Sequence, residues 1–167
     1  EIYKSKNGFK VGVLNLMGNV FMKRCENVFE TIKNFISKNN LKKNYDFLVV
    51  DFHGETTSEK MALGNFLDGK ATLVIGTHTH VPTNDARLLK KGTAYQTDAG
   101  MCGDYDSVIG MNKENSLNKF FNLDAKKNFP ADGEGTMSGV IVDCNDENGL
   151  AKNISSFIFG ADLKNSS

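Results

Sequence analysis

Two apolar stretches separated by one predicted helix constrain the fold of this chain more than any other feature. Residues 47–51 form an apolar run without alternation, which is typical of a strand covered on both faces. A helix is expected to begin at Thr56, because the Thr56 hydroxyl and the Glu59 carboxylate fit a capping box, and residues 71–75 form the second apolar run. A strand, a helix and a strand joined by short links form a right-handed crossover, which makes the two strands parallel. The sequence therefore predicts an α/β fold in which both strands end at the same edge of a sheet.

All three histidines of the chain lie just past these predicted strands. His53 ends the stretch LVVDFH, and His78 and His80 close the stretch VIGTHTH. Because side chains alternate along a strand, His78 and His80 are expected to face the same way, on the rim that also holds His53. A single histidine at a strand end is more often structural, but three on one rim favour a site for a transition metal, which neutral imidazole binds well. We therefore predict that His53, His78 and His80 are metal ligands.

The polar residues near these histidines have less specific patterns. Asp51 is a further ligand, an acceptor that orients an imidazole, or only the end of its strand, and the last interpretation is slightly favoured. Glu55 is adequately explained as an acidic residue in the first turn of a helix. Residues 100–103 form a glycine-containing loop of the kind found near phosphates, which is weak evidence by itself. Cys102, inside that loop, has no histidine near it in the sequence, so a role as nucleophile is not favoured.

Length, charge and cysteine content argue against several classes of protein. With 167 residues, 40% of them hydrophobic, the chain is expected to form one domain over residues 1–167. Twenty basic residues balance twenty acidic residues, which argues against a strong nucleic-acid surface. No apolar run approaches the roughly 20 residues of a membrane span. Three widely spaced cysteines without a CxxC pair indicate free thiols and a reducing compartment, so a cytoplasmic location is expected.

The rest of the chain alternates between strand-like and helical patterns. Three hairpins are predicted, which pair residues 1–3 with 11–16, residues 87–89 with 93–97, and residues 137–144 with 150–159. An amphipathic helix is predicted at residues 26–39, and a short helix at residues 113–122. The chain begins with Glu1 rather than methionine and enters a strand at once, so we expect it to be a processed or truncated piece of a longer protein.

Two stretches of the chain resemble a known family, and they read DFHGETTSEKMALG and VIGTHTHVPTNDARLLKKGTAYQTDAGMCGDYDSVIGM. The family is the bacterial YmdB-like family of calcineurin-type metallophosphoesterases, and the resemblance is to its carboxyl-terminal part. It implies part of a four-layer α/β/β/α metallophosphoesterase sandwich with a centre of two metal ions, usually iron or manganese, with zinc as a further candidate. It also implies hydrolysis of small phosphodiesters such as 2′,3′-cyclic nucleotides.

Carried over onto matching residues, the resemblance assigns His53 and His78 to one metal ion and His80 to the other. The family's aspartate ligand, bridging glutamate, asparagine ligand and proton-donating histidine come from segments that are not found in this sequence. The resemblance thus implies a sandwich whose amino-terminal section is missing. It also implies that the chain has no catalytic proton donor and little activity by itself.

The sequence leaves two functions open. The first is a metal-dependent phosphodiesterase, and the second is a non-enzymatic metal-binding or assembly module whose strand edges pair with another chain. Strands without their neighbours leave apolar faces and unpaired edges exposed, so a homo-oligomer is also expected. Hydrolysis of a phosphodiester by the completed protein distinguishes the two functions, because a binding module stays inert.

Overall fold

The computed structural model describes residues 1–23, 25–160 and 162–163. Strands and helices alternate from residue 10 to residue 77, and the chain closes with a long hairpin. In chain order these elements are β1 (Ile2–Lys4), β2 (Lys10–Met17), α1 (Val28–Lys38), β3 (Phe47–His53), α2 (Thr57–Leu67), β4 (Leu73–Thr77), β5 (Arg87–Leu88), β6 (Ala94–Gln96), β7 (Gly103–Asp104), α3 (Lys113–Phe120), β8 (Gly135–Cys144) and β9 (Ala151–Phe159).

The larger sheet has the strand order β1-β2-β3-β4-β6-β5. Its central strands β2, β3, β4 and β6 run parallel, while β1 and β5 pair antiparallel with β2 and β6 at the two edges. The predicted crossover consists of β3, α2 and β4, with Val49 opposite Leu73 and His53 opposite Thr77. The α/β prediction and the shared carboxyl edge of β3 and β4 are therefore confirmed.

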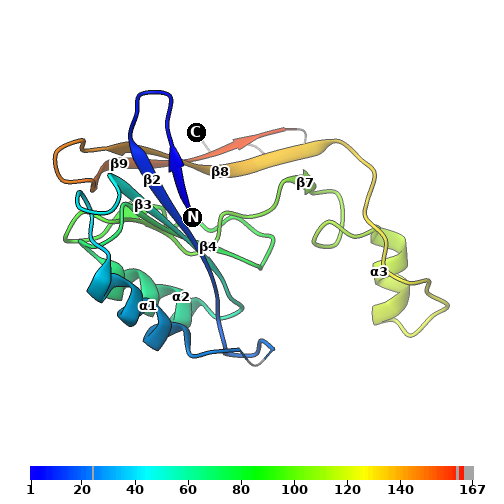
Figure 1. The fold of residues 1–167 in the computed structure, drawn as a ribbon. Helices are drawn as coiled ribbons and strands as arrows, with labels where there is room; N and C mark the ends of the chain where they lie inside the picture. The colour runs from blue at the N-terminus through cyan, green and yellow to red at the C-terminus, as the bar shows by residue number, and fades with distance from the viewer. Residues whose placement is uncertain (24, 161, 164–167) are drawn as a thin grey trace.

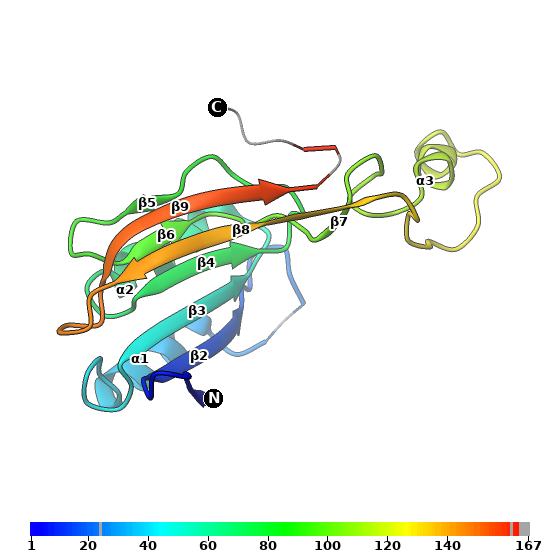
Figure 2. The ribbon, with the colours of Figure 1, turned by 90° about the horizontal axis from the view of Figure 1, so that it is seen from above.

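Helices cover one face of this sheet, and an antiparallel hairpin crosses the other face (Figure 1). The helices α1 and α2 pack on the first face through a core that includes the fully buried Ile32, Leu63 and Val50. On the opposite face β8 and β9 lie over the sheet (Figure 2), where Ala151 joins Leu73 in a second apolar cluster. The described residues thus form three layers, and the fourth layer and the missing amino-terminal section stay predictions.

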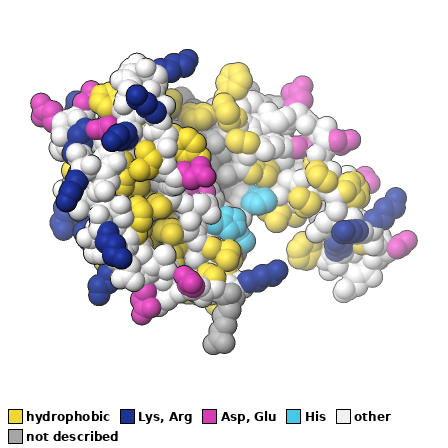
Figure 3. All heavy atoms as spheres, viewed as in Figure 1, with side chains coloured by type: hydrophobic (Ala, Val, Ile, Leu, Met, Phe, Trp, Pro, Cys, Tyr) yellow, Lys and Arg dark blue, Asp and Glu magenta, His cyan; other side chains and the backbone are white. Residues whose placement is uncertain are grey.

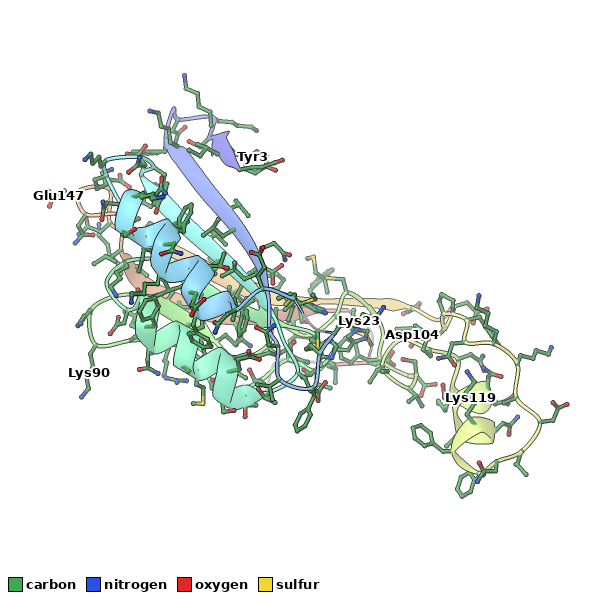
Figure 4. All side chains as sticks on the ribbon, turned by 60° about the horizontal axis from the view of Figure 1, so that its bottom comes forward. Tyr3, Lys23, Lys90, Asp104, Lys119 and Glu147 are labelled. Atoms are coloured by element: carbon green, nitrogen blue, oxygen red, sulfur yellow. The ribbon has the colours of Figure 1, made fainter. Side chains whose placement is uncertain are left out.

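The segment that carries α3 extends away from both sheets (Figures 1 and 2). At its base β7 pairs with β8, and within the segment Asn115 exchanges hydrogen bonds with the backbone of Lys126. Figure 4 shows Lys119 on this segment and Asp104 at its base, while Glu147 lies at the opposite end of the molecule. Hydrogen bonds within this segment stabilise it, and its residues belong to neither of the two apolar clusters.

The start of α2 differs from the predicted capping box. Thr56 is the N-cap residue, but its hydroxyl makes no hydrogen bond. The Glu59 carboxylate, which is buried, instead accepts hydrogen bonds from the backbone amides of Asn19 at 2.9 Å and Val20 at 3.4 Å. The prediction of reciprocal capping is wrong because the loop after β2 takes the carboxylate that the helix start needs.

The cysteines are free thiols, as predicted, at Cys25, Cys102 and Cys144. None of the helices in the described part of the chain combines the length and the apolar character needed to cross a membrane. The single domain, the cytoplasmic location and the homo-oligomer stay predictions.

Asp85 holds together the outer edge of the larger sheet. Its carboxylate accepts hydrogen bonds from the Thr97 amide at 3.0 Å, the Thr97 hydroxyl at 2.6 Å and the Thr83 hydroxyl at 2.6 Å. The Arg87 guanidinium donates a further hydrogen bond at 2.9 Å. Burial alone would raise the pKa of Asp85, but these hydrogen bonds outweigh burial and hold the pKa below its usual range.

Asp85→Asn is expected to lower the free energy of unfolding by about 1–3 kcal/mol at neutral pH. Because the pKa of Asp85 is depressed in the folded state, its carboxylate stabilises the fold above the unfolded value of about 3.9. That contribution is lost as the pH falls through the folded-state pKa. Urea unfolding at neutral pH and at successively lower pH should show the variant and the wild type converging, and a difference that stays constant into strong acid would contradict this account.

Candidate metal centre

The carboxyl ends of β3 and β4 position the candidate histidines. His53 is the last residue of β3 and lies opposite Thr77, the last residue of β4. His78 and His80 follow β4 in a turn, so the strand alternation that predicted a common facing does not apply to them. The structure brings His53 and His78 together, with their rings edge to face and the ring centroids 4.7 Å apart.

A chain of hydrogen bonds fixes the ring of His53. The Thr77 hydroxyl donates to Oδ1 of Asp51 at 2.9 Å, and Oδ2 of Asp51 accepts from the Asn15 amide at 2.7 Å. Since the single hydroxyl hydrogen of Thr77 is used, its oxygen accepts the bond from Nδ1 of His53 at 3.1 Å. Nε2 of His53 therefore presents a free lone pair. Asp51 orients an imidazole through Thr77, and the slightly favoured interpretation as a mere strand end is wrong.

His78 lies between His53 and Glu55. Its Nδ1 is 2.9 Å from Nε2 of His53, and its Nε2 is 2.9 Å from Oε2 of Glu55. Because a carboxylate only accepts hydrogen bonds, Nε2 of His78 donates to Glu55. Glu55 precedes α2, which begins at Thr57, so the interpretation of Glu55 as a helix acid is wrong. The carboxylate of Glu55 orients a second imidazole.

These hydrogen bonds leave one position where a cation is required. A neutral His78 that donates from Nε2 directs the lone pair of Nδ1 at the lone pair of Nε2 of His53, across 2.9 Å. Two such lone pairs repel unless a positive charge joins them, either a proton on Nδ1 of His78 or a metal ion. Two nitrogens bound at a right angle to one metal ion with bonds of about 2.1 Å are themselves about 3 Å apart. The separation of these two nitrogens of His53 and His78 therefore matches two neighbouring ligand positions of a transition metal.

The backbone of the turn at residues 78–80 is strained. His78 has a φ of 121° and His80 a φ of 66°, both in the left-handed region that favours glycine. Strain of this kind persists where surrounding contacts impose it, and it is concentrated at functional sites. Two of the six non-glycine residues with positive φ in the described part of the chain therefore lie in this turn, and His78 has the largest φ among the six.

His80 lies apart from the pair of His53 and His78. Its Nδ1 donates to the carbonyl of Ile109 at 2.8 Å, which leaves its Nε2 free. Figure 3 shows the histidine side chains gathered on one face, between the sheets and the segment that carries α3. Within residues 1–23, 25–160 and 162–163, no three His, Cys, Asp or Glu side chains are arranged to hold a metal ion. The three predicted ligands thus divide into a contacting pair and a single residue, and their ligand roles stay predictions.

The loop at residues 100–103 has a structural explanation. Gly100 has a φ of 77°, and a Cβ there would lie 2.6 Å from Oγ of Ser138 and 2.7 Å from Cδ of Pro82. Close packing therefore requires glycine at this position without any bound phosphate. Cys102 in the same loop is an exposed free thiol.

Known proteins match nearly the whole chain. A family model described as YmdB-like protein matches residues 1–157. The 2′,3′-cyclic-nucleotide 2′-phosphodiesterase of Bacillus subtilis (strain 168) is 40% identical over 165 residues, which cover 96% of this chain and 60% of that protein. Among solved structures, a hypothetical protein from Thermus thermophilus is 35% identical with a TM-score of 0.84, over 95% of this chain and 61% of the other. A novel phosphatase from Mycoplasma pneumoniae is 32% identical with a TM-score of 0.84, over 96% and 56%. This chain spans about 60% of the length of the curated relative.

Proposed function

The chain belongs to the YmdB-like family, and from that membership we propose that it contributes to the metal-dependent hydrolysis of phosphodiesters such as 2′,3′-cyclic nucleotides. One observation supports this most directly, namely the lone pairs of Nε2 of His53 and Nδ1 of His78 that converge across 2.9 Å. The names of the relatives support the reaction class, since one is a cyclic-nucleotide phosphodiesterase and another a phosphatase. Because the chain spans 60% of the B. subtilis protein, the proposed activity concerns a centre to which this chain supplies one part.

Each of the three histidines has a defined task in this proposal. His53 and His78 would hold one metal ion through the converging nitrogens, and His80 would offer its free Nε2 to a second ion. A bound iron, manganese or zinc ion lowers the pKa of water and neutralises charge on the phosphoryl oxygens. Thr77 keeps the hydrogen of His53 on Nδ1, and Glu55 accepts the Nε2 hydrogen of His78, so each ring turns its free nitrogen toward the metal position.

The proton for the leaving oxygen has to come from another group. All three histidines of the chain are engaged in the proposed metal centre, so none is left to act as a general acid. The family resemblance assigns this proton donor and a bridging carboxylate to segments not found in these 167 residues. We therefore propose that the 167-residue chain alone binds metal weakly and has no appreciable phosphodiesterase activity.

Hydrolysis of a 2′,3′-cyclic nucleotide in the presence of Mn²⁺ tests this proposal. The 167-residue chain is compared with a chimera completed by the part of the B. subtilis relative that lies outside the match. We expect metal-dependent turnover by the chimera alone, and its loss when His78 is replaced by alanine. A folded chimera that binds metal without turnover would favour the alternative of a non-enzymatic metal-binding or assembly module. Turnover by the 167 residues alone would show that carboxylates of this chain complete the centre.

Thr77→Val is expected to weaken metal binding by about 10- to 100-fold, the usual effect of removing an outer hydrogen bond from a metal ligand. Valine keeps the shape of threonine in β4 but cannot accept the hydrogen bond from Nδ1 of His53. Calorimetric titration with Zn²⁺ or Mn²⁺ measures the change. Thr77→Ser retains the hydroxyl and should bind like the wild type, so equal affinities of the valine and serine variants would refute the assigned hydrogen on Nδ1.

A further inference from the structure

Lys60 and Asp98 form a buried ion pair next to the turn at residues 78–80. Nζ of Lys60, on α2, lies 2.7 Å from Oδ2 of Asp98, and the two side chains are 1% and 0% exposed. A buried ion pair is weak evidence for stability, because the desolvation of both charges offsets much of their attraction. Neither residue belongs to the proposed metal centre. Neither stability nor direct metal binding therefore explains why this ion pair is buried.

Asp98 connects this ion pair to the turn at residues 78–80. Its Oδ2 also accepts a hydrogen bond from the backbone amide of Thr79 at 3.0 Å, and its Oδ1 accepts one from the Gly100 amide at 2.9 Å. Thr79 is the middle residue of the turn, with a left-handed residue on either side. A strained backbone persists only where surrounding contacts over-determine it. The hydrogen bond to Asp98 is such a contact, made at the centre of the strained segment.

Lys60 holds Asp98 in place from the helical side of the sheet. The Lys60 stem passes close to β4, where a Cβ at Gly76 would lie 2.9 Å from Cδ of Lys60. The backbone of Asp98 is fixed as well, since its amide donates to the Thr83 hydroxyl at 2.9 Å. Burial alone would raise the pKa of Asp98, but hydrogen bonds led by those from Lys60 and Thr79 hold it below its usual range. The carboxylate is therefore charged at neutral pH and a strong acceptor for the Thr79 amide.

We propose that Lys60 and Asp98 are positioning residues that hold the turn at residues 78–80. In the held conformation Nδ1 of His78 faces Nε2 of His53 across 2.9 Å. The inference rests on the proposed function, because it treats these two nitrogens as metal ligands. The ion pair touches neither nitrogen and acts on the site only through the Thr79 amide.

The double variant Lys60→Met/Asp98→Asn tests this inference. Both new side chains are neutral and similar in size to the originals, so the core stays filled. The asparagine side chain has only one acceptor oxygen, whereas the aspartate accepts from the backbone amides of both Thr79 and Gly100. We expect calorimetry to show Zn²⁺ binding at least about 10-fold weaker than in the wild type. The absorption spectrum of bound Co²⁺ should also change, because His78 no longer keeps its orientation. Thermal unfolding of the metal-free variant should stay cooperative, at a temperature lowered by the loss of an acceptor for one buried amide.

Lys42→Met/Asp46→Asn is the matched control, since it also removes an ion pair between a lysine and an aspartate. Asp46 accepts from the Lys10 amide and directly precedes β3, at the end of that strand opposite to His53, so metal affinity and Co²⁺ spectrum should be unchanged. Wild-type affinity and spectrum in the Lys60→Met/Asp98→Asn protein would overturn the inference. Absence of metal binding in the wild type would count against the proposed function instead.

Hydrogen exchange in the wild-type protein gives a test that needs no variant. The Thr79 amide should exchange slowly with solvent in the metal-free protein because it donates to Asp98. The Val81 amide, whose acceptor is the Thr79 hydroxyl at 3.4 Å in an exposed setting, should exchange faster. A Thr79 amide that exchanges as fast as the Val81 amide would overturn the inference even if the double variant failed to fold.

Discussion

Glycine in place of His78 is expected to abolish detectable metal binding and, at the same time, to stabilise the metal-free protein. Loss of Nδ1 removes one of the two converging nitrogens. The affinity for metal should therefore fall by more than the roughly 10- to 100-fold that follows when a residue hydrogen-bonded to a metal ligand is replaced. The φ of His78 is 121°, which glycine adopts without a clash. Relief of about 1–3 kcal/mol of strain exceeds the roughly 0.5–1 kcal/mol that glycine's freedom in the unfolded state costs. The expected net gain in the free energy of unfolding is about 1 kcal/mol.

His78→Ala separates the two effects. Alanine lacks the nitrogen but keeps a Cβ, so this variant should lose metal binding without becoming more stable than the wild type. Calorimetric titration with Zn²⁺ gives the affinities, and urea unfolding without metal gives the free energies of unfolding. Equal stability of the alanine and glycine variants would show that the left-handed backbone at His78 stores no strain. Retained metal binding in either variant would remove His78 from the proposed centre.

The crossover could be predicted from the sequence because its signals are local and agree with one another. The apolar runs at residues 47–51 and 71–75 lie within or beside β3 (Phe47–His53) and β4 (Leu73–Thr77). Chain handedness then makes the strands parallel and brings their carboxyl ends to one edge. Those two steps place His53 and His78 at the same edge of the sheet, and the turn at residues 78–80 then sets the direction in which His78 faces.

The carboxylates near α2 could not be assigned in the same way. Position relative to Thr56 gave both Glu55 and Glu59 a local helix role. Their actual partners are the ring of His78 and the amide of Asn19, the latter 40 residues away in the sequence. The capping-box spacing considers only partners that are close in the sequence. It cannot predict a partner from a distant segment that binds the same carboxylate.

The turn at residues 78–80 escaped prediction for a related reason. Alternation assumes that a strand continues, but β4 ends at Thr77 and the next residue takes a φ of 121°. The ion pair of Lys60 and Asp98 beside this turn joins α2 to the loop after β6, and no spacing in the sequence predicts such a pair. In the sequence Lys60 is an ordinary lysine of a helix, and only its burial against Asp98 reveals a role.

Alanine in place of Gly76 is expected to prevent stable folding. A Cβ at Gly76 would lie 1.7 Å from the carbonyl oxygen of Thr97 and 2.9 Å from Cδ of Lys60. The Thr97 atom belongs to the backbone, and the Ala99 amide donates to the Gly76 carbonyl at 2.9 Å, so β4 and the segment after β6 cannot separate without losing their contact. We expect a loss of more than about 4 kcal/mol, which is a large part of the about 5–15 kcal/mol that stabilises an ordinary domain.

Gly54→Ala is the matched control for this prediction. Gly54 directly follows β3, but the atoms nearest to a Cβ there belong to the Phe52 ring at 3.6 Å, an ordinary contact. Circular dichroism melting should therefore show cooperative unfolding for Gly54→Ala near the wild-type temperature and no such transition for Gly76→Ala. If Gly76→Ala unfolded like Gly54→Ala, β4 would lie farther from the segment after β6 than the structure places it. The hydrogen bond from Thr79 to Asp98 depends on that same close approach and would lose its basis.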